Sequence, residues 1–182
     1  MTKVVNDFID YFKSLPESEK FKLGKTFNEQ TGGKISPYNN PTAVMVGMVQ
    51  IQDDDGIKLL GVRRGIPPHI GGIALPGGFQ EYLEQATSTV AREVFEETGL
   101  KTNSEDYEIF GNPVMSPTNN MLIFFKTKNV YPKSVLKELK LNSEVFEFVL
   151  VDSKTQLCFP LHQEKVNDFY GETLNNKKKI KP

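Results

Sequence analysis

The strongest constraint on this chain lies in residues 78–100, GFQEYLEQATSTVAREVFEETGL. In the second half of the stretch, Glu93, Glu96 and Glu97 follow the i, i+3, i+4 spacing of neighbours on a helix. At about 100° per residue, their carboxylates fall within an arc of roughly 100°. We therefore expect a helix with three carboxylates along one edge. Its apolar residues should face a core: Ala86, Val90, Ala91, Val94 and Phe95.

Carboxylates at this spacing repel one another, which favours their protonation. A hard divalent cation removes the repulsion, because such ions prefer oxygen ligands. Beside the cluster, Arg92 can hold one carboxylate through a bidentate hydrogen bond. Gly99 stands where a helix commonly ends in the left-handed conformation. Upstream, Pro76-Gly77-Gly78 allows a tight turn whose backbone can approach a ligand or a metal closely.

A charged helix edge in solvent would explain a bare E-x-x-E-E pattern, but it does not explain the whole spaced set. The set resembles the Nudix box of the Nudix hydrolases, with every fixed position filled: Gly78, Glu84, Arg92, Glu93, Glu96, Glu97 and Gly99. A full match over the stretch is specific. The resemblance covers roughly residues 41–170. It implies an α/β fold, a Nudix-type α/β/α sandwich with a mixed β-sheet, which the alternation of predicted strands and helices also permits.

The resemblance implies a metal-dependent reaction. Water would cleave the diphosphate of a nucleoside diphosphate linked to another group X, releasing a nucleoside monophosphate. Mg²⁺ or Mn²⁺ would neutralise the diphosphate charge and lower the pKa of water. The family pattern assigns the metal to the Gly77 carbonyl and to the carboxylates of Glu93, Glu96 and Glu97, while Arg92 holds a carboxylate in place.

Other site residues follow from the same resemblance, with an alternative beside each. The general base is either Glu93 or Glu144, since it must reach the attacking water; Glu144 also fits the polar outer face of an edge strand. Arg63 and Arg64, at the end of a predicted strand, are candidates for contacting the substrate. A solvated basic pair explains them equally well. Gly78 is the remaining candidate for substrate binding.

The sequence gives few indications of which nucleotide is the substrate. The run RRGIPPHIGGIALPGG at residues 63–78 and the region of Pro113 and Pro117 look somewhat like ADP-ribose pyrophosphatases. The zinc ribbon and downstream aromatic motif of NADH pyrophosphatases are missing. Nucleoside triphosphates, dinucleoside polyphosphates and capped RNA stay open. A different class of function is a Nudix-like module that senses a nucleotide without cleaving it. Loss of a glutamate from the Nudix box would favour such a sensor, and this sequence keeps all of these glutamates.

The 182 residues suggest one domain with an appendage. We divide the chain into an N-terminal helical extension at 1–36, a Nudix hydrolase domain at 37–175 and a basic tail at 176–182. Apolar spacing predicts helices at 4–12 and 14–29 in the extension. These helices would cover the sheet, shape specificity or form a homodimer contact, and the sequence does not choose among the three.

Within the domain, the sequence predicts a regular alternation of elements. Strands are expected at 43–51 and 57–63 around a hairpin turn at 53–56, and a short strand at 73–75. After the motif we expect strands at 106–115, 121–127 and 143–151, a short helix at 134–139 and a closing helix at 160–170. The lysine-rich tail should be solvated.

The partner that the resemblance implies is a small-molecule nucleotide, and composition argues against two other classes of partner. The net charge of −1 provides no field that would recruit nucleic acid or an anionic membrane. No stretch approaches the roughly 20 apolar residues of a membrane helix. The chain has one cysteine, Cys158, so it cannot form an internal disulfide, and a reducing, cytoplasmic compartment is expected.

Overall fold

The structure is a computed structural model that describes residues 11, 14–16, 18–20, 22 and 40–179, with side chains up to residue 171 in the last helix. The chain divides into two compact units, residues 1–41 and 42–182. The predicted helices at 4–12 and 14–29 lie largely outside the described residues. The boundaries proposed from the sequence, at 36/37 and 175/176, remain predictions.

Strands dominate the second unit, with one helix in its middle and one at its end. Its elements in chain order are β1 (Thr42–Met48), β2 (Gln50–Asp53), β3 (Gly56–Arg64), β4 (Ile73–Ala74), β5 (Gly77–Phe79), α3 (Ala86–Thr98), η1 (Ser104–Asp106), β6 (Tyr107–Ile109), β7 (Val114–Met115), β8 (Asn120–Thr127), β9 (Tyr131–Pro132), η2 (Lys133–Lys137), β10 (Val145–Val151) and α4 (Pro160–Lys179).

The strands form two five-stranded sheets. One has the order β5-β1-β8-β6 with β7 beside β8, and the other has the order β10-β3-β2-β9 with β4 beside β3. Each sheet is mixed, because β1 pairs with β8 and β2 with β9 in parallel, whereas the other pairs are antiparallel. The expected mixed sheet is therefore present, divided into two parts.

The division occurs at Val49, inside the segment 43–51 that we expected to form one strand. Val49 separates β1 from β2, so the chain passes from the first sheet into the second. Its carbonyl still accepts a hydrogen bond from the Leu60 N–H at 2.9 Å. Because this buried backbone group stays paired, the change of sheet leaves no unsatisfied carbonyl there.

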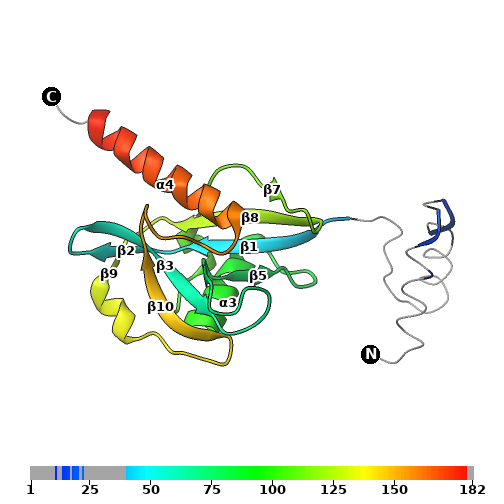
Figure 1. Cartoon of the computed structure of the whole chain (residues 1–182), viewed down its shortest axis with the longest axis horizontal. Coiled ribbons are helices and arrows are strands. Elements are labelled where there is room, and N and C mark those ends of the chain that lie inside the picture. Colours follow the sequence, from blue (N-terminus) through cyan, green and yellow to red (C-terminus); the bar gives the residue numbers. More distant parts are fainter. Residues whose placement is uncertain (1–10, 12–13, 17, 21, 23–39, 180–182) are drawn as a thin grey trace. The chain divides into compact units, whose positions relative to one another are not determined.

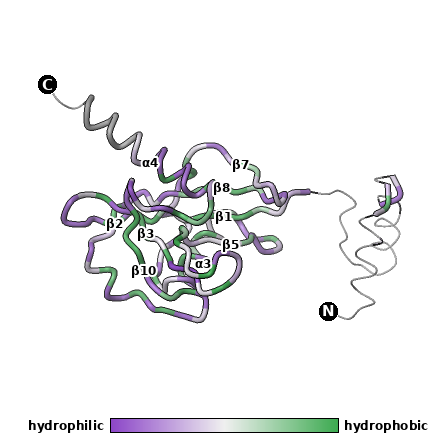
Figure 2. Tube along the Cα trace, in the orientation of Figure 1, coloured by the Kyte–Doolittle hydropathy of each residue, from purple (hydrophilic) through white to green (hydrophobic). Residues whose placement is uncertain are grey.

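Two helices cover opposite faces of the strands (Figure 1). Successive side chains of a strand point to opposite faces, and β1 shows the consequence. Val46 belongs to a core cluster with Val166 and Phe169 of α4, whereas Met45 belongs to a second cluster with Val90 and other residues of α3. Figure 2 shows that hydrophobic residues are concentrated along the central strands. This arrangement is the expected α/β/α sandwich.

Some predicted elements differ from the observed ones. The segment 106–115 contains two short strands, since Gly111 has a positive φ of 68° and interrupts the extended backbone. The closing helix α4 runs to Lys179, well beyond residue 170, and includes part of the basic tail. Strand β5, in the turn before the motif helix, was not predicted. Phe95, expected in the core, is 45% exposed, whereas Val90 and Val94 are fully buried.

Candidate active site

The motif helix α3 runs from Ala86 to Thr98 and ends where the sequence predicts. Gly99 adopts the left-handed conformation, with φ of 75°, and its N–H donates to the Phe95 carbonyl. A residue with a Cβ atom would be strained in that conformation. On the buried side, Val90 and Val94 anchor the helix in the core. This packing fixes the rotation of α3 and directs its acidic edge away from the core.

Arg92 is the organising cation of the acidic edge. Its Nε and Nη2 donate to the two carboxylate oxygens of Glu84, both at 3.0 Å. Its Nη1 donates to Glu93 at 2.7 Å and to Glu96 at 3.0 Å. Its Nη2 also donates to the Phe79 carbonyl at 3.0 Å. The bidentate pairing expected of Arg92 is therefore made with Glu84, outside the three carboxylates assigned to metal.

Glu84 is fully engaged by its neighbours. Besides Arg92, it accepts hydrogen bonds from the Thr89 hydroxyl at 2.8 Å and the Glu81 N–H at 3.1 Å. These donors, the arginine first, lower the pKa of Glu84 to about 2. Thr89 is buried and was not identified from the sequence, although a threonine five residues after a motif glutamate is a signal that could have been used.

Glu93 packs against the glycine turn. A Cβ atom on Gly78 would lie 2.5 Å from the Glu93 carboxylate, and one on Gly77 would collide with the Met45 carbonyl. Only glycine allows this close approach of helix and strand. Burial raises the pKa of Glu93, while hydrogen bonding to Arg92 opposes the shift. Glu93 is thus a partly desolvated carboxylate with one strong donor.

Glu97 lies in a contrasting environment. Its Oε2 atom is buried and has no hydrogen-bond partner. Burial raises the pKa of Glu97 to about 8, and the charge of Glu93 adds to the effect, while the charge of Arg64 opposes it. A buried carboxylate oxygen without a donor is costly. It indicates a position that a cation or a proton would satisfy.

A cavity of about 260 Å³ lies beside these carboxylates. It is lined by Glu93, Glu96, Glu97, Asn142, Ser143 and Glu144; we call it the acidic pocket. The structure thus brings together the three helix glutamates and the loop glutamate that the sequence analysis proposed. Among the six lining residues there is no cation.

Asn142 positions the loop wall of the acidic pocket. Its side-chain amide donates to the Glu96 carbonyl at 2.7 Å. Its Oδ1 atom accepts the N–H groups of Glu144 at 2.8 Å and Val145 at 3.0 Å. Asn142 was not identified from the sequence, because an asparagine before a strand signals a local turn but not a contact with a helix 46 residues away.

Arg63 and Arg64 do not line the acidic pocket. Arg63 pairs with Glu147 at 2.6 Å and donates to the Gly71 carbonyl at 2.9 Å. Arg64 donates to the Pro68 carbonyl at 2.8 Å, and its guanidinium lies 5.2 Å from the Phe159 ring centroid. Both arginines therefore hold the loop that follows β3. A direct contact with substrate remains a prediction.

The acidic edge suits a hard divalent ion in its chemistry, because it offers carboxylate oxygens and one of them lacks a partner. The side chains are not already arranged around an ion: in the described part of the chain, no three His, Cys, Asp or Glu side chains form such a group. One cause is Arg92, whose Nη1 atom binds both Glu93 and Glu96.

None of the described helices combines the length and apolarity needed to cross a membrane.

Comparison with known proteins agrees with the motif. A family model described as NUDIX domain matches residues 41–165. A Caenorhabditis elegans protein named Nudix hydrolase 3 is 32% identical over 77 residues, which cover 42% of this chain and 31% of that protein. The aligned region therefore spans about a third of that relative's length.

Solved structures share the fold. The MutT protein from Methanosarcina mazei has a TM-score of 0.56 and 24% identity, covering 75% of this chain and 98% of that one. The NUDIX domain of Shewanella oneidensis NrtR, solved with ADP ribose, has a TM-score of 0.59 and 17% identity, covering 79% of this chain and 97% of that one. At these identities the likeness shows the fold alone.

Proposed function

This chain belongs to the NUDIX domain family, and we propose that it is a Nudix pyrophosphohydrolase that depends on a divalent metal. Its substrate would be a nucleoside diphosphate linked to X, with a nucleoside monophosphate and phosphorylated X as products. The observation that carries the proposal is the acidic pocket, where Glu97 presents a buried oxygen without a partner. Such an oxygen is an unfavourable feature unless a cation or a proton compensates it.

We assign the metal to Glu93, Glu96, Glu97 and the Gly77 carbonyl. Mg²⁺ or Mn²⁺, when bound, would neutralise the diphosphate charge and acidify the attacking water. Arg92 would release part of its hold on Glu93 and Glu96 and keep its bidentate bond to Glu84. Arg92 is thus a positioning residue, because its bidentate bond to Glu84, which does not line the pocket, holds the guanidinium beside Glu93 and Glu96.

In the hydrolysis, the water oxygen forms a bond to one phosphorus and the bridging P–O bond breaks. A carboxylate must take the water's proton. Glu93 and Glu144 both line the acidic pocket, one from the helix and one from the loop. Glu93 is engaged by Arg92, whereas Glu144 is exposed. The pH–rate profiles of Glu144→Gln and Glu93→Gln will show which of the two residues is the general base, because loss of the base flattens the acidic limb of the profile.

For the substrate, we favour ADP-ribose or a related nucleotide, on the resemblance of residues 63–78 to ADP-ribose pyrophosphatases. Arg63, Arg64 and Gly78 are the proposed contacts. We also propose a cytoplasmic location, which the single cysteine, Cys158, favours. A homodimer through the N-terminal extension remains a further proposal.

The experiment is to measure product release with Mg²⁺ or Mn²⁺ across ADP-ribose, NADH, dinucleoside polyphosphates, nucleoside triphosphates and nucleotide sugars. Turnover of one substrate that is lost with EDTA would support the proposal. No turnover across the panel, together with tight nucleotide binding by calorimetry, would favour the non-catalytic nucleotide sensor instead.

A further inference from the structure

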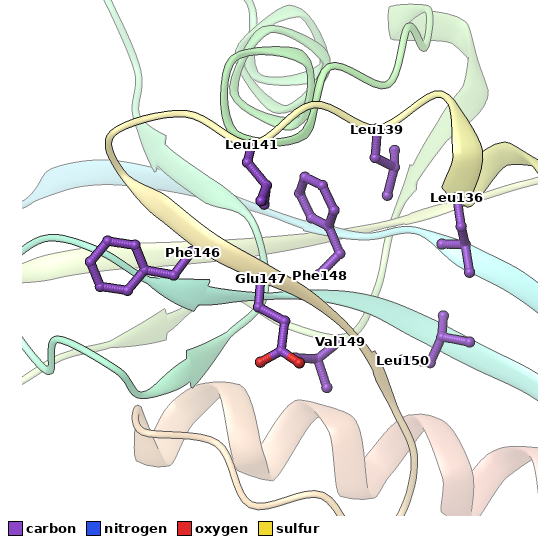
Figure 3. A pocket seen from close by; sticks show the side chains of 8 residues that line it. All are labelled: Leu136, Leu139, Leu141, Phe146, Glu147, Phe148, Val149 and Leu150. Atoms are coloured by element: carbon purple, nitrogen blue, oxygen red, sulfur yellow. The ribbon is translucent and has the colours of Figure 1, made fainter.

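A second, apolar cavity adjoins the acidic pocket. It has a volume of about 460 Å³ and lies between β10 and the segment around η2 (Figure 3). We call it the apolar groove. Its lining consists of leucines, phenylalanines and a valine with one charged residue: Leu136, Leu139, Leu141, Phe146, Glu147, Phe148, Val149 and Leu150. The volume falls in the range of small-molecule sites.

The groove has a packed floor and an exposed rim. Leu139 and Phe148 pack against the core cluster beneath α3, and in Figure 3 the Phe148 ring lies between Leu139 and Leu141. The rim residues are open to solvent: Leu141 is 58% exposed and Phe146 is 56% exposed. Large apolar side chains so exposed around one concave surface suggest a binding site.

The same loop serves both cavities. Leu141 and Phe146 line the apolar groove, and the residues between them, Asn142 to Glu144, line the acidic pocket. Glu144 and Phe146 are two residues apart, so their Cα atoms lie within about 7 Å. The Phe146 ring is also positioned beside Gly65, whose N–H donates to the Glu144 carbonyl at 2.6 Å. A ligand with its diphosphate in the acidic pocket can therefore reach Phe146 through a few bonds.

We propose that the apolar groove binds the nucleobase of the substrate, with Phe146 as the stacking surface. This inference rests on the proposed function, because it takes the diphosphate to lie in the acidic pocket. A sugar is a poor occupant, since its hydroxyls need partners and the one charged lining residue, Glu147, is already paired with Arg63 at 2.6 Å. A base has an apolar face for Phe146 and polar edges that stay hydrated at an exposed rim.

The proposal also defines specificity. Stacking on an aromatic ring tolerates any base, because every base has a π-face. The lining residues offer no unpaired polar side chain that would read a base edge. Diphosphates that carry the same X on adenosine, guanosine, cytidine or uridine are therefore cleaved with kcat/KM values within about tenfold of one another. Stacking without a hydrogen bond to the edge of the base discriminates only weakly between bases.

The direct test is binding, followed by NMR of leucine methyl groups in the full chain. AMP is the probe, and ribose 5-phosphate, which lacks the base, is the matched control. AMP is expected to shift the signals of Leu136, Leu139 and Leu141, and ribose 5-phosphate is not. Equal shifts with both ligands, or AMP shifts confined to other leucines, would overturn the proposal. Because no turnover is needed, this result is independent of whether the chain is an enzyme.

Variants provide a second readout. Phe146→Ala should weaken AMP binding about 5- to 150-fold, the loss found when a stacking aromatic is removed, and Phe146→Trp should restore it. The control is Ile109→Ala on β6, since Ile109 is exposed to a similar extent, 60% against 56% for Phe146, and lines neither cavity. If Phe146→Ala leaves AMP affinity unchanged and instead dissociates a dimer in sedimentation experiments, the groove binds a second copy of the chain and the proposal is wrong.

Discussion

Glu84 and Glu97 belong to one motif and lie 13 residues apart, yet their surroundings are opposite. Glu84 accepts hydrogen bonds from Arg92, Thr89 and the Glu81 backbone, and these donors lower its pKa to about 2. Glu97 has a buried oxygen with no partner, and burial raises its pKa to about 8. The same residue type is therefore stabilised as an anion at one end of the motif and destabilised at the other.

This difference in hydrogen bonding distinguishes a structural role for Glu84 from a metal-binding role for Glu97. A carboxylate with all its hydrogen bonds made inside the protein has little left to offer a ligand. Glu84 fixes Arg92, and Arg92 in turn limits the positions of Glu93 and Glu96. The Oε2 atom of Glu97, in contrast, has no partner in the described part of the protein and is available to a ligand from outside. We expect loss of Glu84 to affect mainly the fold, and loss of Glu97 to affect mainly metal binding and turnover.

The largest expected effect is that of Glu97→Gln on catalysis. The change is nearly isosteric but removes a proposed metal ligand, so metal-dependent kcat should fall about 10²- to 10³-fold, equivalent to losing several kcal/mol of charge stabilisation. Circular dichroism should show an unchanged fold. Full activity in this variant would show that the metal assignment is wrong.

Metal should stabilise the protein through the same residue. At a free Mg²⁺ concentration 100 times its Kd, the free energy of unfolding should rise by about 2.7 kcal/mol, which raises Tm by roughly 5–10 °C for a chain of this size. Thermal denaturation with and without EDTA measures the shift. An equal rise in Glu97→Gln would contradict the role of Glu97, because the variant should respond less.

Glu84→Gln should have the opposite effect to Glu97→Gln, lowering stability more than activity. The amide nitrogen would face the Arg92 guanidinium, donor against donor, and the partly buried arginine would lose its bidentate partner. We expect the free energy of unfolding to fall by about 1–2 kcal/mol, seen as a lower Tm. Activity should fall less than in Glu97→Gln. If Glu84→Gln is as stable as the parent, the hydrogen bonds of Arg92 do not support the fold.

A separate effect concerns the pH dependence of stability in metal-free buffer. The pKa of Glu97 is raised from 4.5 to about 8, so the folded state binds more protons than the unfolded state between these values. Its stabilising contribution is therefore present below pH 4.5 and lost as pH rises toward 8. Glu84 has the opposite sign, because its pKa is lowered to about 2, so its contribution is lost below pH 4.5.

Denaturant titrations in EDTA will measure this dependence. Replacing Glu97 by glutamine should flatten the decline of stability between pH 5 and 8, whereas Glu84→Gln should flatten the decline at acid pH. Identical pH profiles for the two variants would remove the distinction between the two carboxylates.

Much of the fold was predictable because it depends on local patterns. The turn at 53–56, the helix ending at Gly99 and the strand following Ser143 all occur where composition and spacing predict them. The change of sheet at Val49 was not predictable, because β1 and β2 read as one apolar run. The exposure of Phe95 was also missed, since a period-based helix face does not say how far the neighbouring elements extend.

The sequence by itself determined the identity and spacing of the acidic residues, because the i, i+3, i+4 rule on a helix needs no tertiary information. It also determined that glycine must occupy the turn and the helix end. Only the tertiary structure decided which glutamate pairs with Arg92, which oxygen of Glu97 is left without a partner, and that Asn142 brings a distant loop to the helix. These depend on burial and on contacts between residues far apart in the chain, which local spacing does not encode.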